Sequence, residues 1–214
     1  MLSKESEFVA TLLREAPNYG VELMPAQASP LERYHTILNR WNPRLHLVAP
    51  TTDANFARRH ILESLFASQL IEPDSHIVDV GSGGGLPIVP LLTTRADVRA
   101  TLIEANARKG VFLREALIET GCSTRAEIIV NRFEDQSAPH ADTLTCRALD
   151  RFAHFLPQLL LWSTNINLLL LFGGDEMRAL IPDETFDITA HHIPQSERRF
   201  VFAVRRRWNA RHEG

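Results

Sequence analysis

A run of glycines is the part of this sequence best suited to hold a ligand. The segment from His76 to Pro87 reads HIVDVGSGGGLP, and four of the ten glycines in the chain lie between Gly81 and Gly85. Glycine costs conformational entropy, so such a cluster is favoured where the backbone takes unusual angles or approaches a ligand closely. A merely flexible turn is the weaker interpretation. The pattern predicts a binding loop between a strand and a helix.

The glycine spacing and two nearby carboxylates restrict what this loop can bind. Dinucleotide loops carry glycines at the first, third and sixth positions, but the sixth residue from Gly81 is Leu86. The pattern is Gly-x-Gly-x-Gly, with Gly83 in the middle, which disfavours an NAD-dependent reductase. Asp79 precedes the loop, and Glu104 follows the next apolar run, where a carboxylate can bind a ribose diol. The structural alternatives are a helix cap or another structural role for Asp79 and a solvent-exposed strand-end carboxylate for Glu104.

Short apolar runs alternate with amphipathic stretches along the rest of the chain. This alternation is typical of βαβ units and a mostly parallel sheet. We expect strands at 76–80, 100–103, 126–130, 144–146 and 167–172, and a final antiparallel pair at 186–191 and 198–204. The best-defined helix should begin after Ala107 and end with Gly121 as its C-cap. The sequence therefore predicts an α/β fold with a mostly parallel seven-stranded sheet.

The sequence pattern of the first 72 residues predicts helices and no strands. The expected helices run from Phe8 to Glu15, from Pro30 as first helical residue to a stop at Asn42-Pro43, and from about Asp53 to Leu70. We therefore divide the chain into an N-terminal helical cap, residues 1–72, and a ligand-binding core, residues 73–214.

Composition and charge exclude several classes of protein. A chain of 214 residues with 44% apolar and 23% charged residues fits one globular domain with a small appendage. No apolar run approaches a membrane span, and residues 1–8 lack the apolar part of a secretory signal, so we expect a cytoplasmic location. Cys122 and Cys146 should be core residues, and no metal is expected. The net charge is −3, with a small basic end at residues 195–214.

An ordered set of motifs resembles one protein family. The motifs are RWN at 40–42 with LHL at 45–47, RHILESL at 59–65, the loop region 79–91, KGVFL at 109–113, RFE at 132–134 and CRA at 146–148. The loop is similar to those of class I S-adenosylmethionine (SAM) methyltransferases, which have a Rossmann-like fold. The whole set resembles the RsmG (GidB) family, bacterial methyltransferases of guanine N7 in small-subunit (16S) ribosomal RNA. The resemblance covers about residues 30–150 and, more loosely, the final strands.

The resemblance implies which residues bind the cofactor SAM. Together with the loop and its carboxylates, the expected set is Asp79, Gly81, Gly83, Gly85, Leu86, Glu104, Phe133, Glu134 and Arg147. We expect Phe133 to pack on the adenine, and core packing is its alternative. For Arg147 the alternative is a structural ion pair with Glu134 or Asp150.

The resemblance also implies a partner, either 16S ribosomal RNA or the small ribosomal subunit, with a monomer favoured for the protein itself. Arg59, His60, Arg198 and Arg199 are the best candidates for RNA binding, although His60 could instead be a satisfied core histidine. Guanine N7 carries a free lone pair, so positioning can do most of the catalytic work and no catalytic side chain is assigned.

One departure from the family pattern keeps other functions open. The fifth expected strand ends at Phe172-Gly173, where the family usually has Lys-Gly. This difference motivates a first alternative, a SAM-dependent methyltransferase paralogue that acts on a different RNA or a small molecule. The alternative from another class is a non-catalytic protein that binds SAM or the ribosome.

Overall fold

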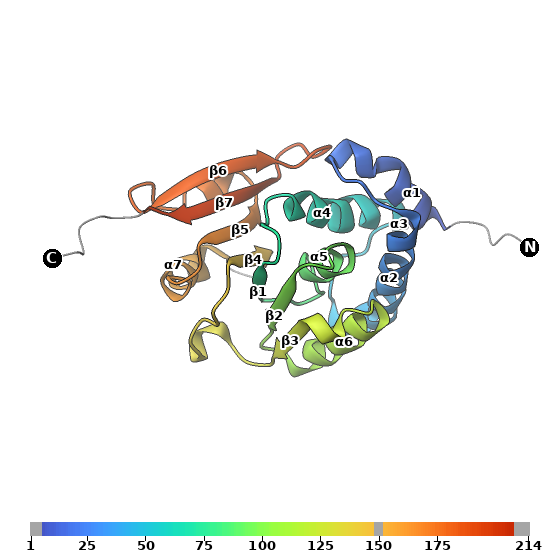
Figure 1. The fold of residues 1–214 in the computed structure, drawn as a ribbon, viewed down its shortest axis with the longest axis horizontal. Coiled ribbons are helices and arrows are strands. Elements are labelled where there is room, and N and C mark those ends of the chain that lie inside the picture. The colour runs from blue at the N-terminus through green and yellow to red at the C-terminus, as the bar shows by residue number, and fades with distance from the viewer. Residues whose placement is uncertain (1–5, 148–151, 208–214) are drawn as a thin grey trace, which may run out of the picture.

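A computed structural model describes residues 6–147 and 152–207, and its seven strands form one sheet (Figure 1). The strands are β1 His76–Val80, β2 Arg99–Ile103, β3 Ala126–Ile129, β4 Thr143–Arg147, β5 Leu168–Gly173, β6 Phe186–His192 and β7 Phe200–Arg206. Their order is β3-β2-β1-β4-β5-β7-β6. Strands β1 to β5 are parallel, and β7 is antiparallel to β5 and β6. The predicted fold class and all seven predicted strands are confirmed.

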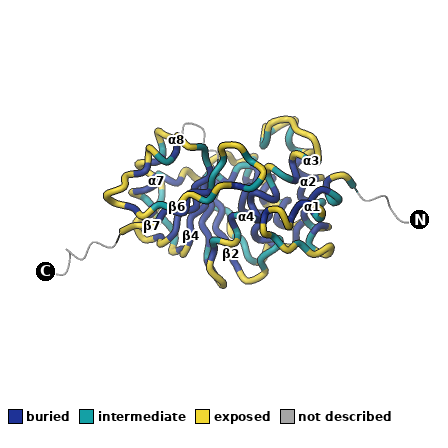
Figure 2. Tube along the Cα trace, turned by 90° about the horizontal axis from the view of Figure 1, so that it is seen from above, coloured by how far each residue is buried: buried dark blue, intermediate teal, exposed yellow. Residues whose placement is uncertain are grey.

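Helices cover both faces of the sheet. They are α1 Glu7–Glu15, α2 Pro25–Leu45, α3 Asp53–Phe56, α4 Glu63–Ser68, α5 Ile88–Thr94, α6 Ala107–Glu119, α7 Phe152–Trp162 and α8 Asp175–Arg178. Figure 1 shows α1 to α6 on one side of the sheet and α7 on the other. In Figure 2 the central strands are dark blue, that is, buried, and exposed yellow segments lie outside them.

Alternate residues of the central strands face the two helical layers. Ile77 and Leu170 pack with the N-terminal helices, and Val78 and Leu171 pack with α7. Strands that are buried on both faces read as nearly continuous apolar runs, which is why β1 and β5 could be recognised in the sequence. The two cysteines also lie in these cores, as predicted. None of the helices within residues 6–147 and 152–207 is long and apolar enough to cross a membrane.

Helix α2 corrects the prediction made for the second helix. It begins at Pro25 rather than Pro30, and it continues through Pro43 to Leu45. A proline inside a helix leaves the carbonyl four residues earlier without its amide partner. Here those carbonyls belong to Ala26 and Asn39, which are exposed and therefore accessible to water. Burial of the apolar face of the helix offsets the remaining cost.

The predicted third helix exists but is not regular. After α3, residues Ala57–Leu62 form a π-helix, and α4 follows directly. The amide of Glu63 donates to the carbonyl of Arg58, five residues earlier. Such a π segment rotates the following side chains relative to an unbroken α-helix, and it is often found at functional sites. The π segment therefore determines the directions in which the side chains of Arg59, His60 and Glu63 point.

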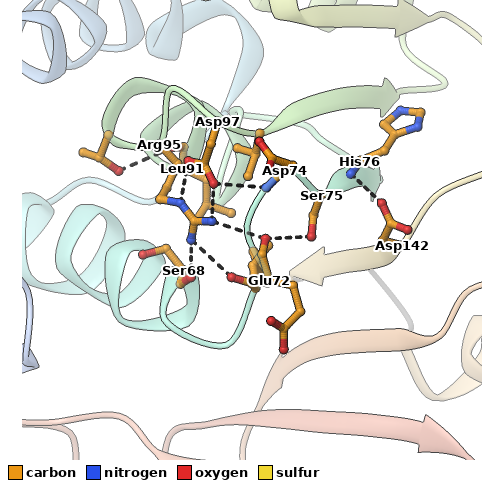
Figure 3. Close-up of polar contacts among 12 residues, drawn as sticks. Ser68, Glu72, Asp74, Ser75, His76, Leu91, Arg95, Asp97 and Asp142 are labelled. Carbon is orange, nitrogen blue, oxygen red and sulfur yellow. Dashed lines mark hydrogen bonds and ion pairs between the residues drawn. The ribbon is translucent and has the colours of Figure 1, made fainter.

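A polar network joins the end of the cap to the core (Figure 3). Arg95, which follows α5, donates through Nη1 to the carbonyls of Ser68 at 3.0 Å and Ile71 at 3.2 Å. Its Nη2 lies 2.6 Å from Asp97, whose carboxylate also accepts the amide of Asp74. The network therefore fixes the segment in which the sequence places the boundary between cap and core.

Candidate functional site

The strand order of the sheet defines where a ligand would bind. Strands β2 and β3 lie on one side of β1, and β4 and β5 lie on the other. Open α/β sheets bind ligands beyond the carboxyl ends of their strands at such a reversal. A pocket of about 630 Å³ lies there, between the glycine loop, the ends of the strands and the cap residues 46–49. That volume is within the usual range for small-molecule sites.

The glycine loop has a conformation that requires glycine. Gly81, Gly83 and Gly85 have φ angles of 72°, 51° and 79°. At Gly85 an added Cβ would also lie 2.7 Å from Cγ2 of Val89, on the helix that follows. The buried hydroxyl of Tyr34, on α2, donates to the carbonyl of Gly84. The loop is therefore held in one shape by the cap, rather than being a flexible turn.

Glu104 is anchored by the backbone beside this loop. Its Oε2 accepts the amide of Gly83 at 2.7 Å, and its Oε1 accepts the amide of Asn106 at 2.8 Å. The side chain lines the pocket, and the residue is 7% exposed. A carboxylate oxygen can accept more than one hydrogen bond, so both oxygens can still receive hydroxyl donors. The alternative of an exposed strand-end carboxylate is wrong.

Asp79 lies beneath the loop and is almost completely buried. Its Oδ1 accepts the hydroxyl of Thr145 at 2.6 Å, and its Oδ2 has no hydrogen-bond partner among the described residues. Burial, which disfavours the charged form, raises the pKa of Asp79 to about 7. The helix-cap alternative is wrong, because Pro87 is the N-cap of α5, whereas the bond to Thr145 is a structural role. Asp79 is not one of the residues that line the pocket.

Asp79 should make the stability of the protein depend on pH. Its folded-state pKa lies above its ordinary value of 3.8, so the stabilisation present below pH 3.8 is lost as the pH rises through 7. Asn does not titrate, so we expect Asp79→Asn to keep its stability over this pH range. The free energy of unfolding of the variant minus that of the parent protein should therefore be about 2 kcal/mol higher at pH 8 than at pH 5. Urea unfolding at the two pH values measures it.

The control for this prediction is Asp142→Asn. Asp142 is exposed and accepts the amide of His76 at 2.8 Å, a bond that an asparagine oxygen can keep. Equal pH dependence in the Asp79 and Asp142 variants would contradict the prediction.

Phe133 and Glu134 follow β3 and lie at the far wall of the pocket. Phe133 is 6% exposed and meets Trp162 and Phe155 edge-on, at centroid distances of 5.7 and 6.4 Å. It also lines the pocket, so it is a core residue with one edge available to a ligand. Glu134 lines the pocket too and pairs with Arg132 at 3.1 Å.

Arg147, at the end of β4, pairs with a residue that the sequence did not indicate. Its Nη2 lies 3.2 Å from Oε2 of Glu63 and donates to the carbonyl of Arg59 at 2.6 Å. The alternative considered for Arg147, a structural ion pair, is thus found, but with Glu63 instead of Glu134, and Asp150 lies outside the described residues. Nη1 is buried and has no partner within the described part of the chain. The guanidinium carbon is 5.6 Å from the ring centroid of Phe172.

Glu63 is the centre of a buried charged cluster. The residue is 2% exposed, and its two oxygens bind different arginines, Arg147 from β4 and Arg199, which directly precedes β7. His60 completes the cluster, with Nδ1 3.3 Å from Nη2 of Arg147. We call these four residues the Glu63 cluster. Its signal in the sequence was an acidic residue within the apolar stretch ILESL.

The four candidate RNA-binding residues are only partly brought together. Arg59 is exposed beside the Glu63 cluster, and His60 lines the pocket. The guanidinium of Arg199 is used by Glu63. Arg198 is 79% exposed and lies 3.4 Å from Asp175, away from the pocket wall. Sequence reasoning missed the cap residues 46–49, which line the pocket, because only the tertiary fold brings them there.

Comparisons with known proteins agree with this geometry. The family model described as GidB, rRNA small subunit methyltransferase G, matches residues 27–207. Ribosomal RNA small subunit methyltransferase G of Gluconobacter oxydans is 42% identical over 119 residues, 56% of this chain and 60% of that protein. The protein of that name from Neisseria meningitidis serogroup C is 34% identical over 137 residues, 64% of this chain and 66% of that protein. The aligned stretch thus spans less than two thirds of these relatives.

A solved structure shows the same fold. A protein of the NADB-Rossmann superfamily from Streptococcus agalactiae matches with a TM-score of 0.57 and 18% identity, over 67% of each chain. At that identity the match supports the Rossmann-like architecture and nothing finer.

Proposed function

Since this chain belongs to the GidB family of small-subunit ribosomal RNA methyltransferases, we propose that it transfers a methyl group from SAM to guanine N7 in 16S ribosomal RNA. The observation that carries the proposal is the extent of the family match, residues 27–207. That range includes both the glycine loop and the cap helix whose Tyr34 holds the loop. The proposal accordingly treats residues 1–72 as a cap that forms one wall of the site and residues 73–214 as the cofactor-binding core.

The residues of the pocket fit SAM. Gly81 and Gly83 have no side chains, so a ligand can approach the backbone of the loop closely. Glu104 is held with free lone pairs for a ribose diol. The residues that would hold the cofactor are Asp79, Gly81, Gly83, Gly85, Leu86, Glu104, Phe133, Glu134 and Arg147. All of them line the pocket except Asp79 and Gly85, which belong to the strand end and the loop that shape it. When bound, SAM supplies a methyl group activated by a sulfonium.

The chain's own residues need only position the acceptor and exclude water. Guanine N7 has a free lone pair, so no side chain has to remove a proton. Orientation of the reactants can contribute roughly 7 to 11 kcal/mol to such a reaction. Leu86 and Phe133 form apolar walls that keep water away. The carboxyl group of Glu104 lies in the wall of the pocket, which suits a transfer that moves a positive charge from sulfur to the base.

RNA would be held outside the pocket by arginines. Arg59 and Arg198 are exposed and can contact phosphates, and Arg199 contributes positive charge from the Glu63 cluster. The partner we propose is 16S RNA or the small ribosomal subunit, and the place of action is the cytoplasm, where ribosomes are assembled.

Two measurements on the purified protein test the proposed function. Calorimetric titration should give saturable binding of SAM and of its demethylated product. Small ribosomal subunits from cells that lack this gene should accept labelled methyl groups, and mass spectrometry of the RNA nucleosides should find 7-methylguanosine. Absence of SAM binding at millimolar concentration would refute the proposal.

Phe172 favours a second candidate function, methylation of another RNA or of a small molecule. Its ring lies against Arg147, at the position where the sequence resemblance led us to expect lysine. Methyl transfer to another acceptor but not to small subunits would favour this candidate. SAM binding without transfer to any acceptor in a single turnover would leave a non-catalytic binding protein.

A further inference from the structure

The pocket is lined by more residues than those assigned to SAM. Besides the glycine loop, Glu104 and Phe133, its lining includes cap residues 46–49 and His60. If the loop and Glu104 hold the methyl donor, as the proposed function requires, the base that receives the methyl group must enter the same pocket. The inference below rests on that function and concerns how His60, a lining residue without a role in binding SAM, recognises the base.

His60 lines the pocket, and its contact with Arg147 assigns its tautomer. Its Nδ1 lies 3.3 Å from Nη2 of Arg147, and a guanidinium has donors only. In this contact Nδ1 is the acceptor, which assigns the proton of the neutral ring to Nε2. Nε2 has no hydrogen-bond partner among the described residues, and it is not one of their fully buried polar atoms. His60 thus offers one free N–H donor.

The surroundings keep His60 uncharged. Burial, assisted by the positive charges of Arg147, Arg59 and Arg199, lowers the pKa of His60 to about 3. Glu63 is the acidic group in this environment, and both its oxygens are bound to arginines. The neutral donor is therefore present throughout the physiological pH range. An imidazolium would add positive charge beside a base that becomes cationic on methylation.

Packing also fixes the direction of the ring. His60 lies in the π segment, and its ring centroid is 4.9 Å from that of Phe56 in the preceding turn of the chain. Arg147, which orients Nδ1, is itself held by the carbonyl of Arg59 and by the carboxylate of Glu63. The donor is therefore preorganised on a rigid part of the protein.

The chemistry of the purine edge identifies what this donor can recognise. Guanine presents two adjacent acceptors, O6 and N7, whereas adenine presents a donor amino group in place of O6. A hydrogen-bond donor on the protein that binds O6 leaves the lone pair of N7 free to react. The same donor would face the amino group of adenine, which is also a donor, so adenine would be disfavoured. We propose that Nε2–H of His60 donates to O6 of the target guanine, so that His60 selects guanine and aligns N7 for methyl transfer.

Two substitutions by amide side chains distinguish a role of His60 as a hydrogen-bond donor from a role in packing alone. In His60→Gln the amide nitrogen can reach the position of Nε2, whereas in His60→Asn the amide reaches only the position of Nδ1. We expect kcat/KM for small subunits to fall less than about threefold in His60→Gln and at least about tenfold in His60→Asn and His60→Leu. The dissociation constant for SAM should stay within about twofold of the parent value in all three variants.

His35→Gln controls for loss of stability. His35 is also a buried cap histidine, and its ring stacks on Phe8 at 4.4 Å and meets Phe56 at 4.6 Å, outside the pocket. Its substitution should lower the thermal midpoint but leave kcat/KM unchanged. Equal losses of kcat/KM in His60→Gln and His60→Asn, or a matching loss of SAM affinity, would overturn the inference.

A spectroscopic measurement tests the donor independently of catalysis. Nitrogen-15 spectra of the free protein should show the ring of His60 as the Nε2–H tautomer, unchanged from pH 5.5 to 8.5. An Nδ1–H tautomer would overturn the inference even if the enzyme is active. If the parent protein binds no SAM or methylates no small subunit, the proposed function itself fails.

Discussion

Glu104→Ala should weaken SAM binding at least about 100-fold. The substitution removes the carboxylate expected to bind the ribose, and it leaves the amides of Gly83 and Asn106 without their acceptor. Each lost charge-assisted hydrogen bond is worth about 1.5 to 3 kcal/mol, and a tenfold change in affinity corresponds to about 1.4 kcal/mol. Because Gly83 belongs to the loop, the loop should also lose its fixed shape. Calorimetry measures the affinity.

Two further variants show whether the effect is specific to this carboxylate. Glu127→Ala removes an exposed charge from the neighbouring strand β3 and should leave SAM affinity unchanged. Glu104→Gln keeps one acceptor oxygen and should give an intermediate loss. If Glu104→Ala binds SAM within threefold of the parent protein, the assignment of Glu104 to the cofactor is wrong.

Arg147→Met should be the most destabilising single change at the site. It leaves Glu63 buried with one arginine in place of two, and the side chain of Arg199 is 32% exposed. Breaking a buried ion pair by removing one partner costs about 3 to 5 kcal/mol, and we expect about 3 because Arg199 remains. Urea unfolding measures the loss, and SAM affinity should fall as well.

Arg132→Met is the matched control. Arg132 also lines the pocket, but its side chain is 60% exposed and its pair with Glu134 lies near the surface, so its loss should cost much less stability than the loss of Arg147. The double variant Arg147→Met/Glu63→Gln should lose less than the sum of the single losses, because the two side chains interact directly. Equal stability of the Arg147 and Arg132 variants would show that the cluster contributes nothing.

The parts of the site that the sequence could predict are those built by neighbouring residues. The strand β1, the glycine loop and the following helix are contiguous, so their spacing alone indicated the binding loop at residues 81–86. Glu104 and Arg147 could be placed at the same edge of the sheet, because parallel strands end there together. These predictions depend only on local pattern and on the direction of the strands.

The parts that could not be predicted depend on packing between distant segments. Proline normally ends a helix, but at Pro30 and Pro43 the burial of one face of α2 and the exposure of the orphaned carbonyls outweigh this preference. Likewise, nothing in the local sequence pairs Glu63 with Arg147, 84 residues away. The π segment that brings them together has no clear sequence signal, since its residues are also compatible with an α-helix.

The hydrogen bond from Tyr34 to Gly84 makes the bend of the loop depend on a residue 50 positions earlier in the chain. A fragment starting at residue 73 would keep every strand and every glycine of the loop. It would lack the Tyr34 hydroxyl, which donates to the loop, and the backbone of Leu47, which lies against Gly84. We therefore expect the smallest fragment of this protein that binds SAM to extend back to the helix that carries Tyr34.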